Sequence, residues 1–422
     1  MISRRSFLRY LGSLPLCAAL GACATPGARR NGHVVVVGGG FAGATLARHV
    51  RLWSAGSVAV TLVERHPVFI SCPMSNRVLG GQLDLVDLTQ SYDRLFGPWG
   101  IEGRFDTAVG IDPDRRTVTL AGGDRLSYDR LVLAPGIDFL PEEIPGLAGE
   151  EVTFPHAWKA GPQTQLLRDQ LTAMRDGGVV ALHIPRAPFR CPPGPYERAC
   201  LVAHYLKRHK PRSKLLVLDA NPEIQSKKTF FQRYFAEEYS GILEYRPNSE
   251  LRQVDAATRT LSLDFETVHA DVANVIPPQR AGRVVDLVGP PLVNGRWVEV
   301  DWRTLGVRGH EHIHCLGDAA FPAPGMPKSG HLANQQGKLL AAILLQDLGY
   351  ASIRPPPALV NACYSFIDDH RAGHVVTVFR FDATRGSFFA VEGAGGVSTN
   401  ASAEEGRLAQ AWARNIWADT LG

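Results

Sequence analysis

Cysteines are the side chains with the most reactive chemistry in this sequence, because a thiolate is a nucleophile and a partner in disulfide formation. Five of them follow the first thirty residues: Cys72, Cys191, Cys200, Cys315 and Cys363. An odd number leaves at least one thiol outside any intramolecular pair. Cys191 stands among four nearby prolines, a rigid frame that would fix a reactive or disulfide-forming sulfur; a structural cystine or an inert buried thiol is the alternative. Cys200 and Cys315 have helical and apolar contexts, so we expect them in the core.

A glycine pattern near the start of the chain has the spacing of a dinucleotide-binding loop. Its residues are Gly38, Gly40 and Gly43. The pattern follows an apolar strand at 34–37 and precedes a helical stretch at 41–52, as in a βαβ unit. Glycines there permit a tight turn and a close approach of the backbone to a pyrophosphate, which the positive end of the helix then faces. Glu64 ends a second strand at 58–63 and is placed to accept from a ribose 2′-hydroxyl.

A second motif, far along the chain, narrows the choice of nucleotide. The strand at 313–316 ends in Gly317-Asp318. This pattern is similar to that of flavoproteins with two dinucleotide-binding domains, in which the aspartate holds a ribitol hydroxyl of FAD. Alone, a Gly-Asp pair is also an ordinary turn at the end of a strand. Together with the glycine loop, it favours FAD over NAD as the nucleotide of the first site.

A second βαβ unit lacks the loop that would hold a nicotinamide nucleotide. A strand at 178–184 precedes a helix at about 196–210 and a further strand at 214–218. Between the first strand and the helix lies a proline-rich stretch, 185–195, where a glycine loop would be needed. Proline supplies no backbone N–H and fixes φ, so this stretch cannot cradle a phosphate. The sequence therefore predicts that reducing equivalents come from a donor other than NAD(P)H.

These elements predict an α/β protein with two doubly wound dinucleotide-binding-type domains, similar to glutathione-reductase-like flavoproteins, and a small C-terminal domain. The predicted domains are a discontinuous FAD-binding domain at 32–155 and 272–357, a second Rossmann-like domain at 156–271, and a C-terminal interface domain at 358–422. A long helix is expected to begin near Lys328 and to run to about residue 348.

The first 28 residues are expected to be an export signal. Residues 3–8 have a twin-arginine pattern, and an apolar stretch at 11–22 follows, which is typical of a twin-arginine signal and predicts a periplasmic protein. Cys23 fits a lipoprotein box, but the residues around it also fit an A-x-A cleavage site, so membrane contact is expected only if Cys23 is lipidated. Three positive charges of the formal net +4 lie in this segment. The rest of the chain is near neutral, which does not favour a nucleic-acid partner.

Several long segments resemble one family, the flavoprotein subunit of flavocytochrome c sulfide dehydrogenase. The resemblance covers nearly all of residues 33–370. The segments that carry it are 34–40, 71–81, 154–161, 187–198, 276–282, 326–330 and 361–365.

The resemblance implies a role for three of the cysteines. Cys72 matches the position that carries FAD through a thioether, and Cys191 and Cys363 match a redox-active disulfide beside the flavin. It also implies that hydrosulfide opens this disulfide by displacement, as in thiol–disulfide exchange, with Glu197 as the candidate acid/base. A solvated helix-terminal carboxylate is the alternative for Glu197.

The remaining predicted site residues would hold the cofactor. A helix that begins at Lys328-Ser329 would direct its positive end at the flavin and stabilise its reduced anionic form. The full predicted cofactor set is Gly38, Gly40, Gly43, Glu64, Cys72, Gly317, Asp318, Lys328 and Ser329. No metal site is predicted.

The electrons are expected to leave through a separate, haem-bearing cytochrome c, because no C-x-x-C-H motif occurs in the chain. A sulfide:quinone oxidoreductase is the nearest alternative, although residues 400–422 show no strong apolar face for a membrane. A flavin-bearing docking subunit without catalysis is a further alternative. The substrate expected from the resemblance is a small inorganic sulfur species.

Overall fold

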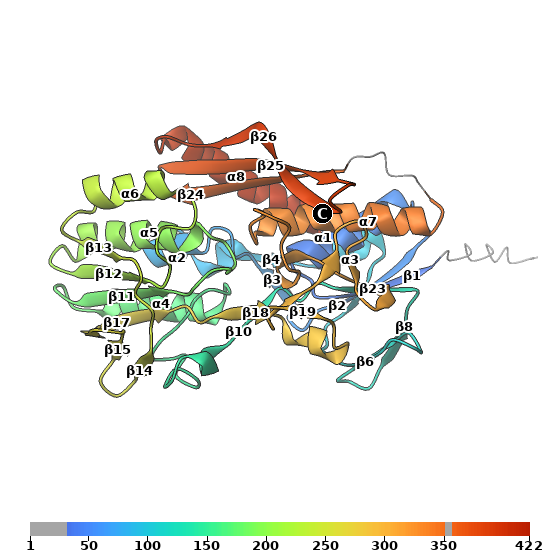
Figure 1. The fold of residues 1–422 in the computed structure, drawn as a ribbon, viewed down its shortest axis with the longest axis horizontal. Coiled ribbons are helices and arrows are strands. Elements are labelled where there is room, and N and C mark those ends of the chain that lie inside the picture. Colours follow the sequence, from blue (N-terminus) through green and yellow to red (C-terminus); the bar gives the residue numbers. More distant parts are fainter. Residues whose placement is uncertain (1–31, 351–356) are drawn as a thin grey trace, which may run out of the picture.

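The computed structural model describes residues 32–350 and 357–422. The predicted signal segment with Cys23 lies outside the described residues, as does the stretch 351–356. Two α/β domains lie side by side along the long axis, and the C-terminal segment lies across both (Figure 1). Within the described ranges, no helix has the length and apolar character needed to cross a membrane.

The first domain is built on a seven-stranded sheet with the order β21-β22-β23-β9-β1-β2-β5. The five strands from β23 to β5 run parallel, and the short β21 and β22 are antiparallel to their neighbours. The strands are β1 (His33–Val37), β2 (Ala59–Val63), β5 (Glu102–Arg104), β9 (Arg130–Leu133), β21 (Val300–Asp301), β22 (Gly306–Val307) and β23 (His310–Cys315). Val34 to Val36 are completely buried, as expected for a parallel strand covered on both faces.

The helices α1 (Phe41–Trp53) and α7 (Gly330–Asp347) pack against each other over this sheet. Gly337 allows the close approach, since an added Cβ would lie 2.6 Å from the carbonyl oxygen of Ala42. The predicted long helix near 328–348 is thus confirmed. Shorter elements complete the first domain: β3 (Val68–Ile70), α2 (Asn76–Gly80), β4 (Thr89–Ser91), α3 (Asp93–Trp99), β6 (Ala108–Asp112), β7 (Thr117–Leu120), β8 (Arg125–Ser127), β10 (Ile137–Phe139), β18 (Gln279–Ala281), β19 (Leu292–Val293) and β20 (Trp297–Val298).

The second domain has a four-stranded parallel sheet with the order β13-β12-β11-β17. Its elements are α4 (Pro162–Ala173), β11 (Val179–Ile184), α5 (Gly194–His209), β12 (Lys214–Asp219), α6 (Lys228–Glu237), β13 (Leu243–Arg246), β17 (Val272–Val275) and the small antiparallel sheet β14 (Gln253–Asp255), β15 (Thr260–Ser262) and β16 (Thr267–His269). The predicted boundary at residue 271 is corrected here. Strand β17 pairs with β11, so the second domain includes 272–275.

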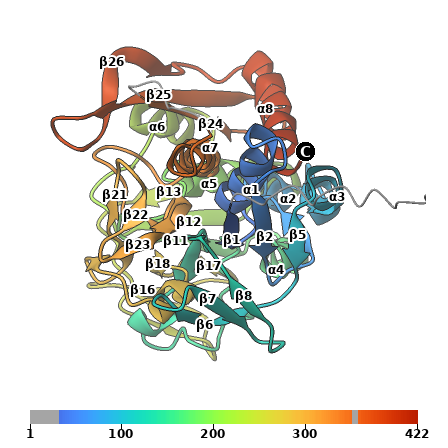
Figure 2. The same ribbon diagram turned by 90° about the vertical axis from the view of Figure 1, so that its right-hand side faces the viewer.

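The C-terminal domain is a three-stranded antiparallel sheet and one helix. Its elements are β24 (Ala358–Phe366), β25 (Ala372–Asp382), β26 (Ser387–Val397) and α8 (Ala403–Leu421). Figure 2 shows α7 beneath this sheet and α8 beside α1. Strand β24 contacts α7 of the first domain and α5 of the second, so its residues lie where the two domains meet.

Candidate functional site

The glycine loop after β1 leaves no room for side chains at two of its three motif positions. Gly38 has φ +108°, and an added Cβ would lie 2.3 Å from the carbonyl oxygen of Ala134. A Cβ on Gly43 would lie 1.9 Å from the carbonyl oxygen of Gly38. Gly40 is different, because an added Cβ would meet no atom within 4 Å. Two glycines therefore close the loop onto its strand and helix, and the third faces the open space where a pyrophosphate would approach.

Glu64 lies directly against this loop. One carboxylate oxygen accepts from the backbone N–H of Gly39 at 2.7 Å, and the other accepts from the N–H of His66 at 2.9 Å. The Tyr92 hydroxyl donates to the carbonyl oxygen of Gly39 at 3.0 Å. The carboxylate thus lies at the carboxyl end of the parallel sheet beside the N-terminus of α1, which suits a ribose of FAD.

A small cavity lies between the end of β23 and the start of α7. Gly317, Asp318, Lys328 and Ser329 are among the residues that line it. Burial raises the pKa of Asp318, against the opposing effect of the nearby charges of Arg190 and Lys328. The structure therefore brings together the predicted cofactor residues from 317–318 and from 328–329.

Lys328 is buried, with its ammonium group over the Trp297 ring at 3.7 Å from the centroid. Its Nζ donates to the carbonyl oxygens of Asp318 at 2.8 Å and Ala320 at 2.6 Å. Burial lowers the pKa of Lys328 to about 7, although Asp318 opposes this shift. The Lys328 ammonium group therefore gives up its proton more readily than that of an exposed lysine.

Ser329 is the N-cap of α7. Its hydroxyl accepts from the N–H of Leu332 at 3.1 Å and donates to Asn361 Oδ1 on β24 at 2.7 Å. This arrangement satisfies one free N–H of the helix and ties the helix end to the strand that carries Cys363.

Cys191 and Cys363 come together at this helix end from opposite parts of the chain. Cys191 lies in the loop between β11 and α5 with φ +58°, and its N–H donates to the carbonyl oxygen of Lys328 at 2.8 Å. Cys363 lies on β24, and its thiol is close enough to that of Cys191 for each to change the pKa of the other. Both are free cysteines in the structure. Gly194 keeps the space open, since a Cβ there would lie 2.9 Å from Cys191 Sγ.

The two thiols have different electrostatic environments. The interaction between the two thiols raises the pKa of Cys191 and lowers the pKa of Cys363. Burial raises the pKa of both thiols. The Lys227 ammonium lowers the pKa of Cys363, and Arg190 lowers that of Cys191. The Lys227 ammonium, which donates to the carbonyl oxygen of Cys363 at 3.0 Å, therefore favours Cys363 as the sulfur that carries a negative charge.

Glu197 lies on the first turn of α5 beside this pair. Its carboxylate accepts from Asn76 Nδ2 at 2.8 Å and from the N–H of Phe366 at 2.8 Å. Burial raises the pKa of Glu197, and the two hydrogen bonds only partly offset this effect. A carboxyl group whose pKa is raised in this way keeps its proton to a higher pH than an exposed glutamate, which suits a residue that gives and takes protons. The solvated-carboxylate alternative does not fit these contacts.

Two further charged residues at the site were missed by the sequence analysis. Arg198 is buried and donates to Asn274 Oδ1 at 2.8 Å and to the carbonyl oxygens of His156 and Ala157 at 2.9 and 2.7 Å. Lys227 is also buried and lies near Cys363. Arg198 stands inside a segment that carries the family resemblance, which was a usable signal. No sequence pattern distinguishes Lys227 from a surface lysine.

Cys72 lies in the turn after β3, and its Sγ accepts from the N–H of Ala160 at 3.5 Å. The thiol is partly buried. The adjacent Pro73 lies against the start of α7, since its Cγ would be 3.5 Å from a Cβ on Gly330. Cys200 and Cys315 are completely buried, which confirms their predicted place in the core.

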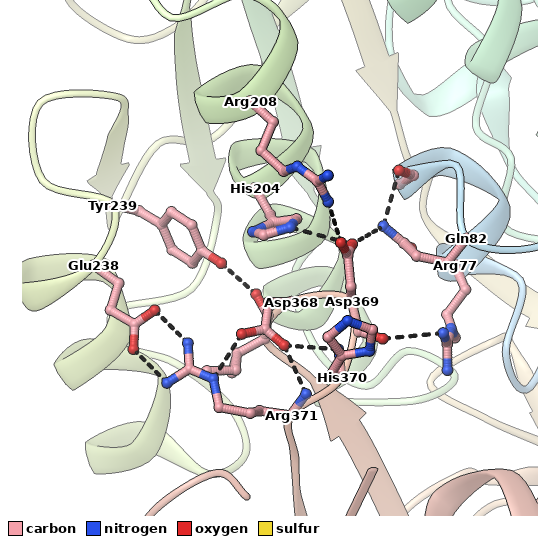
Figure 3. A network of polar contacts seen from close by, with 12 residues as sticks. Arg77, Gln82, His204, Arg208, Glu238, Tyr239, Asp368, Asp369, His370 and Arg371 are labelled. Carbon is pink, nitrogen blue, oxygen red and sulfur yellow. Dashed lines mark hydrogen bonds and ion pairs between the residues drawn. The ribbon is translucent and has the colours of Figure 1, made fainter. Parts of the chain in front are cut away.

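Polar contacts from the second domain and from α2 hold the turn between β24 and β25, residues 367–371 (Figure 3). Asp369 accepts from Gln82 Nε2 at 2.8 Å and pairs with Arg208 of α5. Arg371 forms a two-pronged pair with Glu238, just beyond α6, at 2.9 and 2.7 Å. The strand that carries Cys363 is therefore anchored a few residues beyond the sulfur.

Comparisons with known families show which family this chain belongs to. The model described as sulfide dehydrogenase [flavocytochrome c] flavoprotein chain, central, matches residues 164–277, and the model for the flavin-binding part of flavocytochrome c sulphide dehydrogenase matches 355–421. A pyridine nucleotide-disulphide oxidoreductase model matches 32–176. The chain belongs to the flavocytochrome c sulfide dehydrogenase flavoprotein family. Its cofactor is FAD, and the family is one of sulfide-oxidising flavoproteins.

Individual relatives place the family among other flavoproteins. The sulfide-quinone reductase of Aquifex aeolicus is 31% identical over 360 residues, which cover 78% of this chain and 80% of that protein. The sulfide dehydrogenase [flavocytochrome c] flavoprotein chain of Chlorobaculum thiosulfatiphilum is 53% identical over 45 residues, which cover 11% of this chain and 92% of that sequence.

Solved structures confirm the predicted fold class. The sulfide:quinone oxidoreductase of Aquifex aeolicus superposes with a TM-score of 0.71 at 21% identity, with 92% of this chain and 91% of that chain covered. A putidaredoxin reductase in complex with putidaredoxin gives a TM-score of 0.68 at 17% identity, with 92% and 94% covered.

Proposed function

We propose that this chain oxidises sulfide through a disulfide between Cys191 and Cys363 and delivers the electrons to a separate cytochrome c subunit. The observation that carries this proposal is the meeting of two cysteines: Cys191, whose N–H donates to the carbonyl oxygen of Lys328 beside the N-terminus of α7, lies next to Cys363 of β24. Oxidation of this pair would place a disulfide beside the cavity that Asp318, Lys328 and Ser329 line.

Each turnover begins with displacement at the disulfide. A hydrosulfide anion forms a bond to one of the two sulfurs and the sulfur–sulfur bond breaks, so one cysteine becomes a persulfide and the other a thiolate. Bound FAD supplies a two-electron acceptor that can release electrons singly to a one-electron partner. The ammonium form of Lys328 and the N-terminus of α7 would stabilise negative charge on the bound cofactor.

Glu197 is proposed as the group that moves protons. Its raised pKa allows it to take a proton from H₂S and to return one to a departing sulfur. The hydrogen bonds from Asn76 and from the Phe366 N–H fix the carboxylate beside the strand that carries Cys363. We further propose that Cys72 carries FAD covalently, since its partly buried thiol lies one residue before Pro73, which contacts the start of α7.

The cellular setting is part of the proposal. A twin-arginine signal at 1–28 would export the folded protein to the periplasm, where a haem-bearing cytochrome c chain takes the electrons and Cys23 would supply membrane contact if it is lipidated. The kinship to sulfide-quinone reductases makes quinone the rival acceptor.

Anaerobic mixing with sulfide, while the flavin absorbance is recorded, tests the proposal. Sulfide is expected to bleach the flavin, and oxidised cytochrome c is expected to restore the colour much faster than a soluble quinone. Cys191→Ser should abolish bleaching, while Cys200→Ala, which alters a core thiol, should leave it intact. Bleaching that persists in Cys191→Ser would remove the disulfide from the mechanism, and faster recovery with quinone would reassign the acceptor. Acid denaturation shows whether the yellow flavin stays attached to the polypeptide. After the same treatment, the Cys72→Ala protein should release its flavin.

A further inference from the structure

Lys227 is a buried lysine beside the sulfur pair, at the N-cap of α6. It adopts φ +55°, in the left-handed region that costs an ordinary residue conformational energy. Its Nζ donates to the carbonyl oxygen of Cys363 at 3.0 Å, to Ser365 Oγ at 3.0 Å and to the carbonyl oxygen of Gly373 at 2.8 Å. The ammonium group therefore joins both strands of the β24–β25 hairpin at the position of Cys363.

None of these three acceptors is charged, so hydrogen bonding alone does not neutralise the ammonium charge. A buried positive charge is costly unless an anion lies near. The anionic groups that face Lys227 are the Cys363 and Cys191 sulfurs, Glu197 on α5 and Glu405 on α8. Glu405 already accepts from Ser398 and contacts His374. Among these anionic groups, Cys363 is the one whose own carbonyl oxygen accepts a hydrogen bond from Lys227.

We propose that Lys227 is the positioning residue that makes Cys363 the thiolate and so directs hydrosulfide to the sulfur of Cys191. This inference deepens the proposed function and rests on it. In the directed step, the hydrosulfide sulfur bonds to Cys191 Sγ, the Cys191–Cys363 bond breaks, and the electron pair of that bond leaves on Cys363. The products are a Cys191 persulfide and a Cys363 thiolate, with charge −1 before and after the step.

The direction of this step follows from leaving-group chemistry. In thiol–disulfide exchange, the thiol with the lower pKa leaves faster. The groups facing Cys363 are Cys191 from the 185–193 loop, Lys227 at the start of α6 and Glu197 on α5. Of these, Lys227 alone carries a positive charge. Glu197 opposes a thiolate at Cys363 when ionised, so its raised pKa limits that opposition.

The first arm of the test measures the alkylation rate of each of the two thiols separately and needs no sulfide. Full-length holoenzyme is reduced with dithiothreitol, freed of reductant, and alkylated for short times with iodoacetamide between pH 5 and pH 10. Peptide mass spectrometry then gives the rate at each cysteine. Wild-type protein should react first at Cys363, with a midpoint below that of Cys191. In Lys227→Met the Cys363 midpoint should rise by about one unit or more, which lowers its rate near neutral pH about tenfold.

Two variants separate charge from fold. Lys227→Arg keeps the charge and should keep a low Cys363 midpoint. Lys228→Met removes the next lysine, an exposed residue paired with Glu223, and should leave both profiles unchanged. An unchanged Cys363 profile in folded, flavin-containing Lys227→Met overturns the inference. In a second arm, one equivalent of sulfide followed by acid quenching should place the extra sulfur on Cys191, and a persulfide on Cys363 also overturns it. Flavin bleaching by sulfide in Cys191→Ser would instead contradict the proposed function. It would not change which of the two thiols alkylation shows to have the lower midpoint.

Discussion

The glycine loop makes two opposite predictions for two glycines only three positions apart. Gly43→Ala would place a Cβ 1.9 Å from the carbonyl oxygen of Gly38, whereas Gly40→Ala would meet nothing within 4 Å of protein. Gly43→Ala should therefore lower the stability of the protein. Gly40→Ala should lower only its affinity for FAD.

The magnitudes follow from these contacts. Ordinary contacts of a Cβ begin near 3.4 Å, so Gly43→Ala must move the loop from the helix by more than 1 Å, an overpacking that costs roughly 1–3 kcal/mol and lowers Tm by about 2–10 °C in a protein of this size. Gly40 has φ −71° and ψ −167°, which alanine adopts freely. Its replacement should change the stability of the cofactor-free protein by less than about 1 kcal/mol and weaken FAD binding about tenfold or more, because the methyl group occupies the approach of the pyrophosphate.

Both variants are best measured in a Cys72→Ala background, so that FAD can be removed and added back whatever its linkage. Thermal unfolding of the cofactor-free protein gives the stability, and flavin fluorescence quenching on titration gives the affinity. Gly43→Ala should lose stability and affinity together, and Gly40→Ala should lose affinity alone. If Gly40→Ala binds FAD as the parent does, the loop does not hold the pyrophosphate and the assignment of this site is wrong.

Three further predictions concern packing and pH. Gly194→Ala would bring a Cβ to 2.9 Å from both Cys191 Sγ and Trp158 Cη2. This overpacking should displace the Cys191 sulfur and slow disulfide formation on mild oxidation about tenfold. Thiol titration over time measures the rate. Burial and nearby positive charges lower the pKa of His156 to about 3. Because this histidine takes up a proton near pH 6.5 in the unfolded chain, the free energy of unfolding should fall as the pH drops below 6.5, by at most about 5 kcal/mol at pH 3. Urea titrations should show a smaller fall in His156→Gln. The pKa of Lys328 is lowered to about 7 in the folded protein, whereas the unfolded chain holds this proton up to about pH 10.5. The free energy of unfolding of the cofactor-free protein should therefore rise by up to about 5 kcal/mol between pH 7 and 10.5. Urea titrations of Lys328→Met should lack this rise.

The local elements of this fold were predictable because each depends on a short stretch of sequence. The apolar run at 34–37 with its glycines specifies a strand, a tight turn and a helix without help from the rest of the chain. Strand β17 at 272–275 is an element whose place local sequence does not determine. Its buried sequence suits the centre of either parallel sheet, and pairing with β11, some ninety residues earlier, decides between them.

The charged residues of the site were the least predictable part. Lys227 has acceptors at 363, 365 and 373, and a lysine in an isolated sequence is normally assigned to the surface. Its burial depends on a hairpin more than 130 residues away. The pairing of Cys191 with Cys363 is equally non-local, and the odd cysteine count alone left it open; only the family resemblance implied it.

The second domain shows how a nucleotide fold is put to another use. Asp219 ends β12 in the place that Glu64 has at the end of β2. Glu64 accepts from backbone N–H groups of its own loop, whereas Asp219 is completely buried and accepts from the Tyr196 and Tyr245 hydroxyls at 2.8 and 2.9 Å and from the Asn221 side chain at 2.7 Å.

An acid whose acceptor sites are filled by side chains of its own domain has none to offer a ribose, and a proline-rich loop has few N–H groups to offer a phosphate. What the domain supplies instead is rigid support. The loop after β11 presents Cys191, the first turn of α5 presents Glu197, and the start of α6 presents Lys227, all toward the single strand that carries Cys363. The parallel sheet thus orients a sulfur pair, because the loops that follow its strands lie against β24 and the start of α7.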